Sequence, residues 1–277
     1  MTSNNNIQMA LNAIKASRWR SFLTMLGVII GVTSVVTVVS LGEGVKQQLN
    51  KQIEHTGSDL ITVRGGRVAT RDSKGRIDKV NLPSLFASAN LSEADYQSIL
   101  KMPDLTVVAP FASVPGVAKA TQSQIETTSA IVATNHKGAQ ALNQNVLYGD
   151  FFGEKDQTSA VAVIGKTVAE ELFKENVPVG KSFELRGQKI IVRGIFQEFE
   201  SSPLGLGLNY NNTIFIPYEY AKQLAGGSLQ PYQILIRSSE TQTVDSTINR
   251  VTTTLRDAHG GQTDFTVLQA SDNIALA

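Results

Sequence analysis

One long stretch without charge constrains this chain more than any other feature of its sequence. No charged residue occurs between Ser21 and Gly42. As an α-helix that rises about 1.5 Å per residue, this stretch reaches roughly 30 Å, enough to cross the hydrocarbon layer of a bilayer. A secretory signal has a shorter apolar region, of roughly 7 to 15 residues, followed by small residues at a cleavage site. We therefore predict an uncleaved transmembrane helix over residues 21–42.

Basic residues precede this predicted span without any acidic residue among them. Lys15, Arg18 and Arg20 lie before it, whereas the residues that follow it carry both signs of charge. An excess of positive charge marks the cytoplasmic side of a span, and Trp19 occupies the position of an interfacial aromatic residue. We predict a cytoplasmic N-terminus, a single span of the cytoplasmic (inner) membrane and an extracytoplasmic main domain.

The segment before the span has a short helical pattern of apolar residues. Ile7, Leu11 and Ile14 recur at helical spacing, which favours an amphipathic segment over residues 1–20 at the inner membrane face. A frayed polar terminus is the alternative, because the pattern covers only about two turns.

Two glycines lie four residues apart within the span, at Gly27 and Gly31. Small residues at this spacing allow membrane helices to approach one another closely. Simple tolerance of glycine in membrane helices is the alternative, and we favour packing against another helix.

The composition excludes several classes of protein. The net charge is +1 and no basic stripe with interleaved aromatic residues occurs, so we expect no nucleic-acid partner. Cysteine is absent, which excludes disulfide frameworks and thiolate metal sites. The region after the span must therefore be stable through its apolar core.

Beyond the span, helical and strand patterns alternate. A stalk helix is predicted over residues 43–57, a strand at 59–64, and an irregular basic loop from Arg67 to Asn90. Ser92 and Asp95 form a capping-box pattern that begins a helix at Glu93–Lys101. Further strands are predicted at 105–109, 114–120, 125–134, 160–164, 183–185, 189–196, 213–216, 232–237 and 265–268, and further helices at 137–142, 168–173, 218–224 and 244–255. The fold class is therefore α+β (mixed α/β), with residues 58–112 and 213–270 as similar units that flank an insertion.

No constellation of residues indicates an enzyme. Gly165-Lys166-Thr167 and Gly180-Lys181-Ser182 resemble phosphate-binding loops, but Ala160 and Glu175 stand where the upstream glycine is required. His55, His136 and His259 are far apart in the sequence, and we interpret them as scattered surface residues. We predict no catalytic residues, no metal site and no cofactor.

An unusual apolar loop follows the strand at 189–196. Leu204, Leu206 and Leu208 alternate with glycines and would expose apolar surface. A partner-contact loop and a loop tucked over a sheet edge are both open interpretations.

Several blocks together resemble one family. The blocks are the stretch from Ser17 to Gly66, "VAVIGKTVAEELFKENVPVGKSFELRGQKIIVRGIF", "NNTIFIPYEYAKQL" and "DFTVLQASD". They are similar to MacB-like permeases of ABC transporters, with FtsX-type and lipoprotein-releasing proteins as more distant relatives. The resemblance implies an extracytoplasmic domain with a porter-like layer of paired α/β units, at 58–112 and 213–270, and a small inserted α/β lobe at 113–212.

The resemblance also implies the function and the partners. It implies a permease subunit that couples ATP hydrolysis by a separate cytoplasmic ABC ATPase to extracytoplasmic motion, for efflux of drugs, peptides or other amphiphiles or for mechanical signalling. Expected partners are that ATPase, the membrane, a second permease copy or the remaining permease helices, and a periplasmic adaptor protein. Because the family continues into a second membrane helix where this chain ends, we expect a fragment of a longer permease or a shortened protein that borrows helices. A membrane-anchored adaptor module without transport activity is the alternative function.

Overall fold

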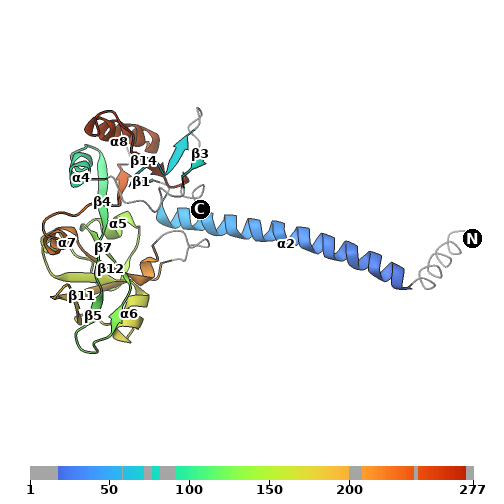
Figure 1. The fold of residues 1–277 in the computed structure, drawn as a ribbon, viewed down its shortest axis with the longest axis horizontal. Coiled ribbons are helices and arrows are strands. Elements are labelled where there is room, and N and C mark those ends of the chain that lie inside the picture. The colour runs from blue at the N-terminus through green and yellow to red at the C-terminus, as the bar shows by residue number, and fades with distance from the viewer. Residues whose placement is uncertain are drawn as a thin grey trace, which may run out of the picture. The chain divides into compact units, whose positions relative to one another are not determined.

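The computed structural model describes residues 18–57, 59–71, 77–81, 91–199, 208–239 and 243–272 (Figure 1). The chain divides into two compact units, residues 1–50 and 51–277, and each is described by itself.

A single long helix, α2 (Arg18–Thr56), contains the predicted span and the predicted stalk. Among the described residues, its segment Trp19–Gln48 is the one helical stretch long and apolar enough to cross a membrane, with a mean hydropathy of 2.4. Its apolar side chains are exposed. The helix ends as predicted at Gly57, whose φ of 92° is the left-handed conformation that closes helices.

A mixed sheet is the framework of the second unit. From one edge to the other, its described strands are β14 (Phe265–Gln269), β1 (Leu60–Gly65), β13 (Gln233–Ser238), β4 (Leu105–Ser113), β7 (Ala130–Thr134), β12 (Thr213–Pro217), β9 (Val161–Ile164), β11 (Gln188–Phe196), β10 (Ser182–Leu185), β5 (Ala118–Ala120) and β6 (Glu126–Thr127), while β8 (Val146–Gly149) pairs with β11. The helices of this unit are α4 (Glu93–Leu100), α5 (Gly138–Ala141), α6 (Lys166–Phe173), α7 (Tyr218–Leu224) and α8 (Val244–Ala258), with short 3₁₀ turns η1 (Glu154–Asp156) and η2 (Tyr210–Asn212).

Strand β4 belongs to both parts of this sheet. Its residues up to Phe111 pair with β13, and its last two residues, Ala112 and Ser113, pair with β7. The strands on the β13 side, β14, β1, β13 and β4, are all antiparallel to their neighbours. On the other side, β7 pairs in parallel with β12, and β9 with β11. One continuous strand therefore joins two differently built sheet regions.

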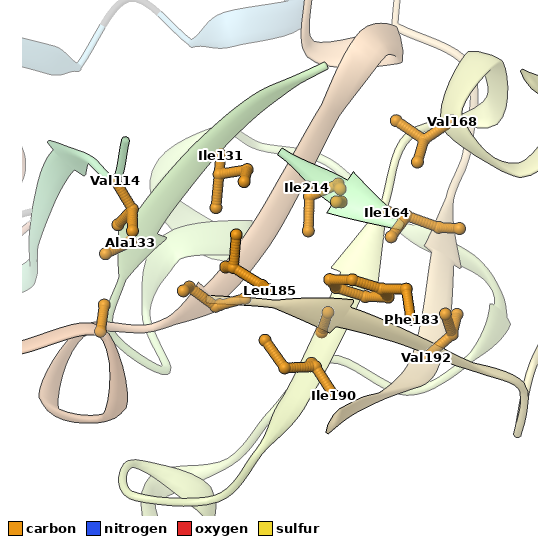
Figure 2. Packing of buried hydrophobic residues seen from close by; sticks show 14 of the residues in the cluster. Val114, Ile131, Ala133, Ile164, Val168, Phe183, Leu185, Ile190, Val192 and Ile214 are labelled. Atoms are coloured by element: carbon orange, nitrogen blue, oxygen red, sulfur yellow. The ribbon is translucent and has the colours of Figure 1, made fainter. Parts of the chain in front are cut away.

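Each sheet region has its own apolar core. Helices α4 and α8 cover one face of the β14–β4 region, and in Figure 1 they lie together at the end of the unit opposite α6. Val251 and Leu255, one turn apart on α8, are fully buried there and form part of the apolar face of this helix. In the other region, Figure 2 shows Ile131, Ile214 and Phe183 pointing into a common apolar interior.

Local sequence signals were accurate where they involve short-range hydrogen bonds. The predicted capping box is confirmed, since Ser92 and Asp95 each accept a hydrogen bond from the other's backbone N–H. Strands β10 and β11, predicted as strands at 183–185 and 189–196, pair as a hairpin with Arg186 and Gly187 at positive φ in a two-residue turn.

The predicted irregular loop at 67–90 is wrong in part. Strands β2 (Ala69–Arg71) and β3 (Ile77–Val80) pair as a separate antiparallel hairpin within it. The hairpin is fastened to β14 by a hydrogen bond of 2.9 Å from the Val68 N–H to the Thr266 hydroxyl. This anchor comes from almost two hundred residues away, so local periodicity does not reveal it.

The predicted boundaries of the porter-like part and the inserted lobe stay a prediction. Residues 51–277 form one compact unit that is not divided at these positions. Within it, β12 pairs with β7 and β9 and lies on their side of β4, whereas β13 lies on the other side.

Neighbouring residues of β11 offer a matched test of this core. Ile190 is fully buried, whereas Ile191 on the opposite face is 46% exposed. We expect Ile190→Ala to lower the free energy of unfolding by about 2–5 kcal/mol because it leaves a cavity, and Ile191→Ala to lower it by less than about 1 kcal/mol. Urea unfolding of both variants measures the difference, and equal losses would contradict the assigned faces of β11.

Candidate functional site

The most constrained polar site lies where α2 passes into the sheet. After Gly57 the chain turns into β1, and Asp59 there forms an ion pair with the guanidinium of Arg237 on β13. A Cβ atom at position 57 would lie 2.5 Å from Nη1 of Arg237 and 2.6 Å from Oδ1 of Asp59. Glycine is favoured here by its positive φ, and a larger residue would also displace the ends of the Arg237 and Asp59 side chains.

Arg237 connects this turn to a third element. Its Nε donates to the backbone oxygen of Gln140 at 3.2 Å, and its Nη2 donates to that of Ala141 at 3.2 Å. Both oxygens lie in the last turn of α5, and the oxygen of Gln140 also accepts from the backbone N–H of Asn143 at 3.1 Å. The Arg237 side chain is only 10% exposed. A buried guanidinium thus joins the end of α2, the strand β13 and the helix α5, and we call these groups the Arg237 junction.

This junction is suited to holding elements together. Its described groups are one carboxylate, one guanidinium and two carbonyl oxygens, and the guanidinium engages the carboxylate in an ion pair. Within the described ranges, no group of side chains is arranged to hold a metal ion.

A second buried polar cluster surrounds His259, which the sequence analysis placed on the surface. The ring is 13% exposed and has a carboxylate at each nitrogen: Asp264 lies 2.6 Å from Nδ1 and Asp95 lies 3.0 Å from Nε2. The Phe265 ring packs edge-on against it. The surface interpretation is wrong because the fold brings α4, the end of α8 and the start of β14 together around this residue.

The carboxylates determine the charge of this histidine. Burial by itself lowers the pKa of the imidazole, but the hydrogen bonds to Asp264 and Asp95 outweigh it, and the net pKa of His259 is raised. Asp95 also accepts from the backbone N–H and the hydroxyl of Ser92, at 2.7 and 2.9 Å. A shallow hollow opens beside Ser92, Asp95, His259 and Asp264. Since both ring nitrogens face carboxylates, His259 is not placed to activate Ser92.

In the two sequences that resemble phosphate loops, each lysine forms an ion pair with a glutamate. Lys166 bonds to Glu198 at 2.7 Å, and Lys181 bonds to Glu175 at 2.5 Å. A Cβ at Gly165 would collide with the backbone oxygens of Asn211 and Tyr210, so this glycine serves tight backbone packing.

The residues predicted for the membrane segment are only partly described. Gly27 and Gly31 lie one turn apart on α2, and a Cβ at either position would have no described atom within 4 Å, so their packing role stays a prediction. Trp19 is 79% exposed and contacts the Phe22 ring, and Arg20 is exposed. Lys15 lies outside the described residues, and of Arg18 only the backbone is described.

The apolar loop is also described only at its end. Leu208 is 40% exposed, while Leu204 and Leu206 lie outside the described residues. Asn211 holds the start of this loop by accepting from the backbone N–H of Phe199 and donating to its backbone oxygen, both at 2.8 Å. Partner contact by this loop stays a prediction.

Sequence reasoning missed the Arg237 junction altogether. The one available signal was an arginine at the end of the apolar strand pattern Ile234-Leu235-Ile236. A charged residue there is as compatible with an exposed strand end as with a buried ion pair, and only the neighbouring α5 and Asp59 decide between them.

The described chain thus combines an exposed apolar helix, long enough to cross a membrane, with an α+β domain. The profile of the MacB-like periplasmic core domain matches residues 21–254. The chain therefore belongs to the MacB-like periplasmic core domain family, which occurs in permeases of ABC exporters.

Related proteins support this assignment. The chain is 29% identical to the macrolide export ATP-binding/permease protein MacB of Marinobacter nauticus over 94% of its length, and 30% identical to the pyoverdine export ATP-binding/permease protein PvdT of Pseudomonas syringae pv. tomato over 98%. The matched region is 38% of each relative, so the chain spans less than half of their length.

Solved structures share the fold. The periplasmic region of MacB from Actinobacillus actinomycetemcomitans superposes with a TM-score of 0.62 and 16% identity, over 82% of this chain and 96% of that one. The extracellular domain of the ABC-type transporter YknZ from Gram-positive bacteria gives 0.55 and 19%, over 76% and 100%. These likenesses confirm the predicted fold class of an N-terminal apolar helix and a mixed α+β domain.

Removing the guanidinium from the Arg237 junction should be costly. We expect Arg237→Ala to lower the free energy of unfolding by about 2–4 kcal/mol, because it removes the guanidinium donor of the buried Ala141 carbonyl oxygen and the ion pair to Asp59. Urea unfolding measures this loss. The control is Lys119→Ala, which removes an exposed ion pair of 3.9 Å to Glu126 and should cost less than about 1 kcal/mol. Similar losses in both variants would contradict a structural role for the junction.

The His259 cluster should make stability depend on pH. Because the pKa of His259 is raised by folding, its contribution is complete below the unfolded value of about 6.5 and is lost as the pH rises through the folded pKa. We expect the stability difference between the wild type and His259→Gln to shrink as the pH rises from about 5 to about 9. His136→Gln is the control, since the ring of His136 contacts the Gln157 amide and not a carboxylate. A difference that grows with pH would contradict the assignment.

Proposed function

We propose that this chain is the membrane-anchored outer part of a MacB-type ABC exporter permease, in which α2 transmits motion between the membrane and the extracytoplasmic domain. The observation that carries the proposal is the Arg237 junction at the end of an uninterrupted helix. Membership of the MacB-like periplasmic core domain family supports it.

Transmission requires a stiff connection, because a flexible linker would absorb a displacement before it reached the domain. α2 runs without a break from Arg18 to Thr56 and contains no proline. Directly after it, Asp59 is held by Arg237, which also bonds to α5. A displacement at the end of α2 would thereby act on β13 and α5 together.

ATP hydrolysis is proposed to take place outside the described domain. The names of the relatives combine ATP binding and permease activity in one protein, and the matched region is a minor part of each. We infer that in this system a separate cytoplasmic ABC ATPase subunit hydrolyses ATP, and that the described domain is not an enzyme. The ion pairs of Lys166 with Glu198 and of Lys181 with Glu175 support this inference.

The membrane placement follows from charge and from the span. We propose that the chain crosses the cytoplasmic membrane once with its N-terminus inside, since Lys15, Arg18 and Arg20 precede the apolar segment. Gly27 and Gly31 would face a further permease helix or a second copy of the permease. A periplasmic adaptor protein is a further proposed partner.

The extracytoplasmic domain is proposed to have a porter-like part and an inserted lobe that meet along β4. We assign residues 58–112 to the porter-like part and residues from 113 onward to the inserted lobe. This boundary lies beside the point at which β4 changes its pairing partner from β13 to β7, between Phe111 and Ala112. Because β12 pairs within the lobe, we propose that the chain returns to the porter-like part at β13.

The proposed cargo is an amphiphile, such as a drug or peptide. The relatives are named for export of macrolides and of pyoverdine, and both names belong to those proteins alone. A membrane-anchored adaptor without transport activity is the alternative that the experiment must separate from export.

Interrupting the stiff connection should uncouple ATP hydrolysis from export. We expect insertion of Gly-Gly-Ser-Gly between Thr56 and Gly57 to reduce ATP-dependent export of a macrolide at least about tenfold, while ATP hydrolysis continues, because the inserted residues would absorb the motion of α2. The measurement uses the protein purified from membranes with its associated ATPase and reconstituted into vesicles.

The same insertion between Gly226 and Gly227 is the control. Both glycines have positive φ in an open turn, so the insertion should leave export and hydrolysis unchanged. Full export after the insertion at residue 56 would contradict transmission through α2. Absence of any ATPase from the purified protein would favour the adaptor.

A further inference from the structure

An arginine near the other end of β1 has no acidic partner among the described residues. Arg64 is half-buried, and its Nε and Nη2 donate to the side-chain oxygen of Gln233 at 3.4 and 3.3 Å. These distances are longer than the usual length of about 2.9–3.0 Å. In the part of the chain that the structure describes, no carboxylate lies within ion-pairing distance of Arg64. A charged group that is partly removed from water is normally paired, so this guanidinium has unused binding capacity.

Two tyrosine hydroxyls share this environment. The Gln233 amide donates to the Tyr210 hydroxyl at 3.4 Å, and the Tyr232 hydroxyl is buried without a hydrogen-bond partner among the described residues. Burial is the largest influence on both phenols and raises their pKa values, while the nearby charge of Arg64 opposes that rise. Both hydroxyls therefore keep their protons, and Tyr232 has a proton that it can donate to an anion.

Aromatic rings continue from this polar group into the core. The Tyr210 ring lies 5.3 Å from that of Phe199 and 5.8 Å from that of Phe215, and Phe199 lies 5.2 Å from Phe196. Phe215 and Phe196 are buried, but Tyr210 and Phe199 are only half-buried. An apolar surface with partial access to solvent thus lies beside the guanidinium of Arg64.

We propose that Arg64 and Tyr232 bind the acidic group of an anionic amphiphile, whose apolar body contacts the rings of Tyr210 and Phe199. A phosphate or carboxylate has oxygens that match the planar donors of a guanidinium, and a further oxygen accepts from the Tyr232 hydroxyl. Such a ligand would provide the hydrogen-bond partners that Gln233 supplies only at long distance and that Tyr232 lacks among the described residues. The proposal concerns binding; as a statement about exported cargo it rests on the proposed function.

Hexyl phosphate tests the proposal, because it joins an oxyanion to a short apolar chain and dissolves without forming micelles at low concentration. Inorganic phosphate and 1-hexanol represent its two halves. We would titrate each compound into the full chain in nanodiscs of uncharged lipid, without ATP, and measure binding by calorimetry. We expect saturable binding of hexyl phosphate, and binding at least about tenfold weaker for inorganic phosphate and for 1-hexanol.

Two substitutions in the site should weaken this binding. Arg64→Gln removes the charge and is expected to weaken hexyl phosphate binding at least about tenfold, and Tyr232→Phe removes one donor and should weaken it about threefold or more. Tyr232→Phe breaks no described hydrogen bond, so the variant should remain folded. Tyr220→Phe is its matched control, since the Tyr220 hydroxyl is also buried without a described partner but belongs to the core around α7. Arg67→Gln is the control for charge, because Arg67 is exposed and bonds to Thr263.

Unchanged affinity for hexyl phosphate in Arg64→Gln or in Tyr232→Phe would overturn the proposal. So would losses of affinity in Arg67→Gln and Tyr220→Phe that equal those in the two site variants. Equal binding of inorganic phosphate and hexyl phosphate would overturn the assignment of an amphiphile. Because the titration needs neither ATP nor transport, its failure would leave the exporter proposal standing. Conversely, absence of export by the wild-type protein together with intact hexyl phosphate binding would count against the exporter proposal alone.

Discussion

The buried guanidinium of Arg237 is the interaction on which the arrangement of this domain depends. Removing such a group from water costs several kcal/mol, and only fixed acceptors of good geometry offset that cost. Those acceptors come from Asp59 after α2 and from the last turn of α5, so both elements must be in place around β13. Gly57 suits the same point because its φ of 92° favours glycine and a Cβ there would displace the two side chains of the ion pair.

The two sheet regions are held in one compact unit on both sides of the β14–β4 region. On one side, Phe111, Leu235 and Leu60 share a core with Phe152, Phe196 and Phe215 from the region beyond β4. On the other side, α4 makes the connection: Glu93 forms an ion pair of 2.5 Å with Lys222 of α7, and the Tyr96 ring lies 5.8 Å from that of Tyr218. α4 also contacts His259, whose Nε2 lies 3.0 Å from the carboxylate of Asp95. Packed contacts therefore join the two sheet regions on both faces, as the proposed transmission of motion through β1 and β13 would require.

Family membership and structure support different parts of the functional argument. The family match covers most of α2 and most of the domain and places the chain in the MacB-like periplasmic core domain family. It does not explain why particular residues are charged and buried. The Arg237 junction and the half-buried Arg64 are properties of this chain's own structure, and they lead to separate experiments on transmission and on ligand binding.

The sequence by itself determined the features that depend on nearby residues. The span, the helix end at Gly57, the capping box at Ser92 and the hairpin turn at Arg186 could all be predicted, because their hydrogen bonds or apolar faces involve residues only a few positions apart. The tertiary structure alone decided the sites. Arg237 meets Asp59 across 178 positions, and His259 meets Asp95 across 164, so their burial and pairing arise only when distant strands and helices come together. The free energy of a charged group depends on its surroundings in space, which local periodicity does not encode.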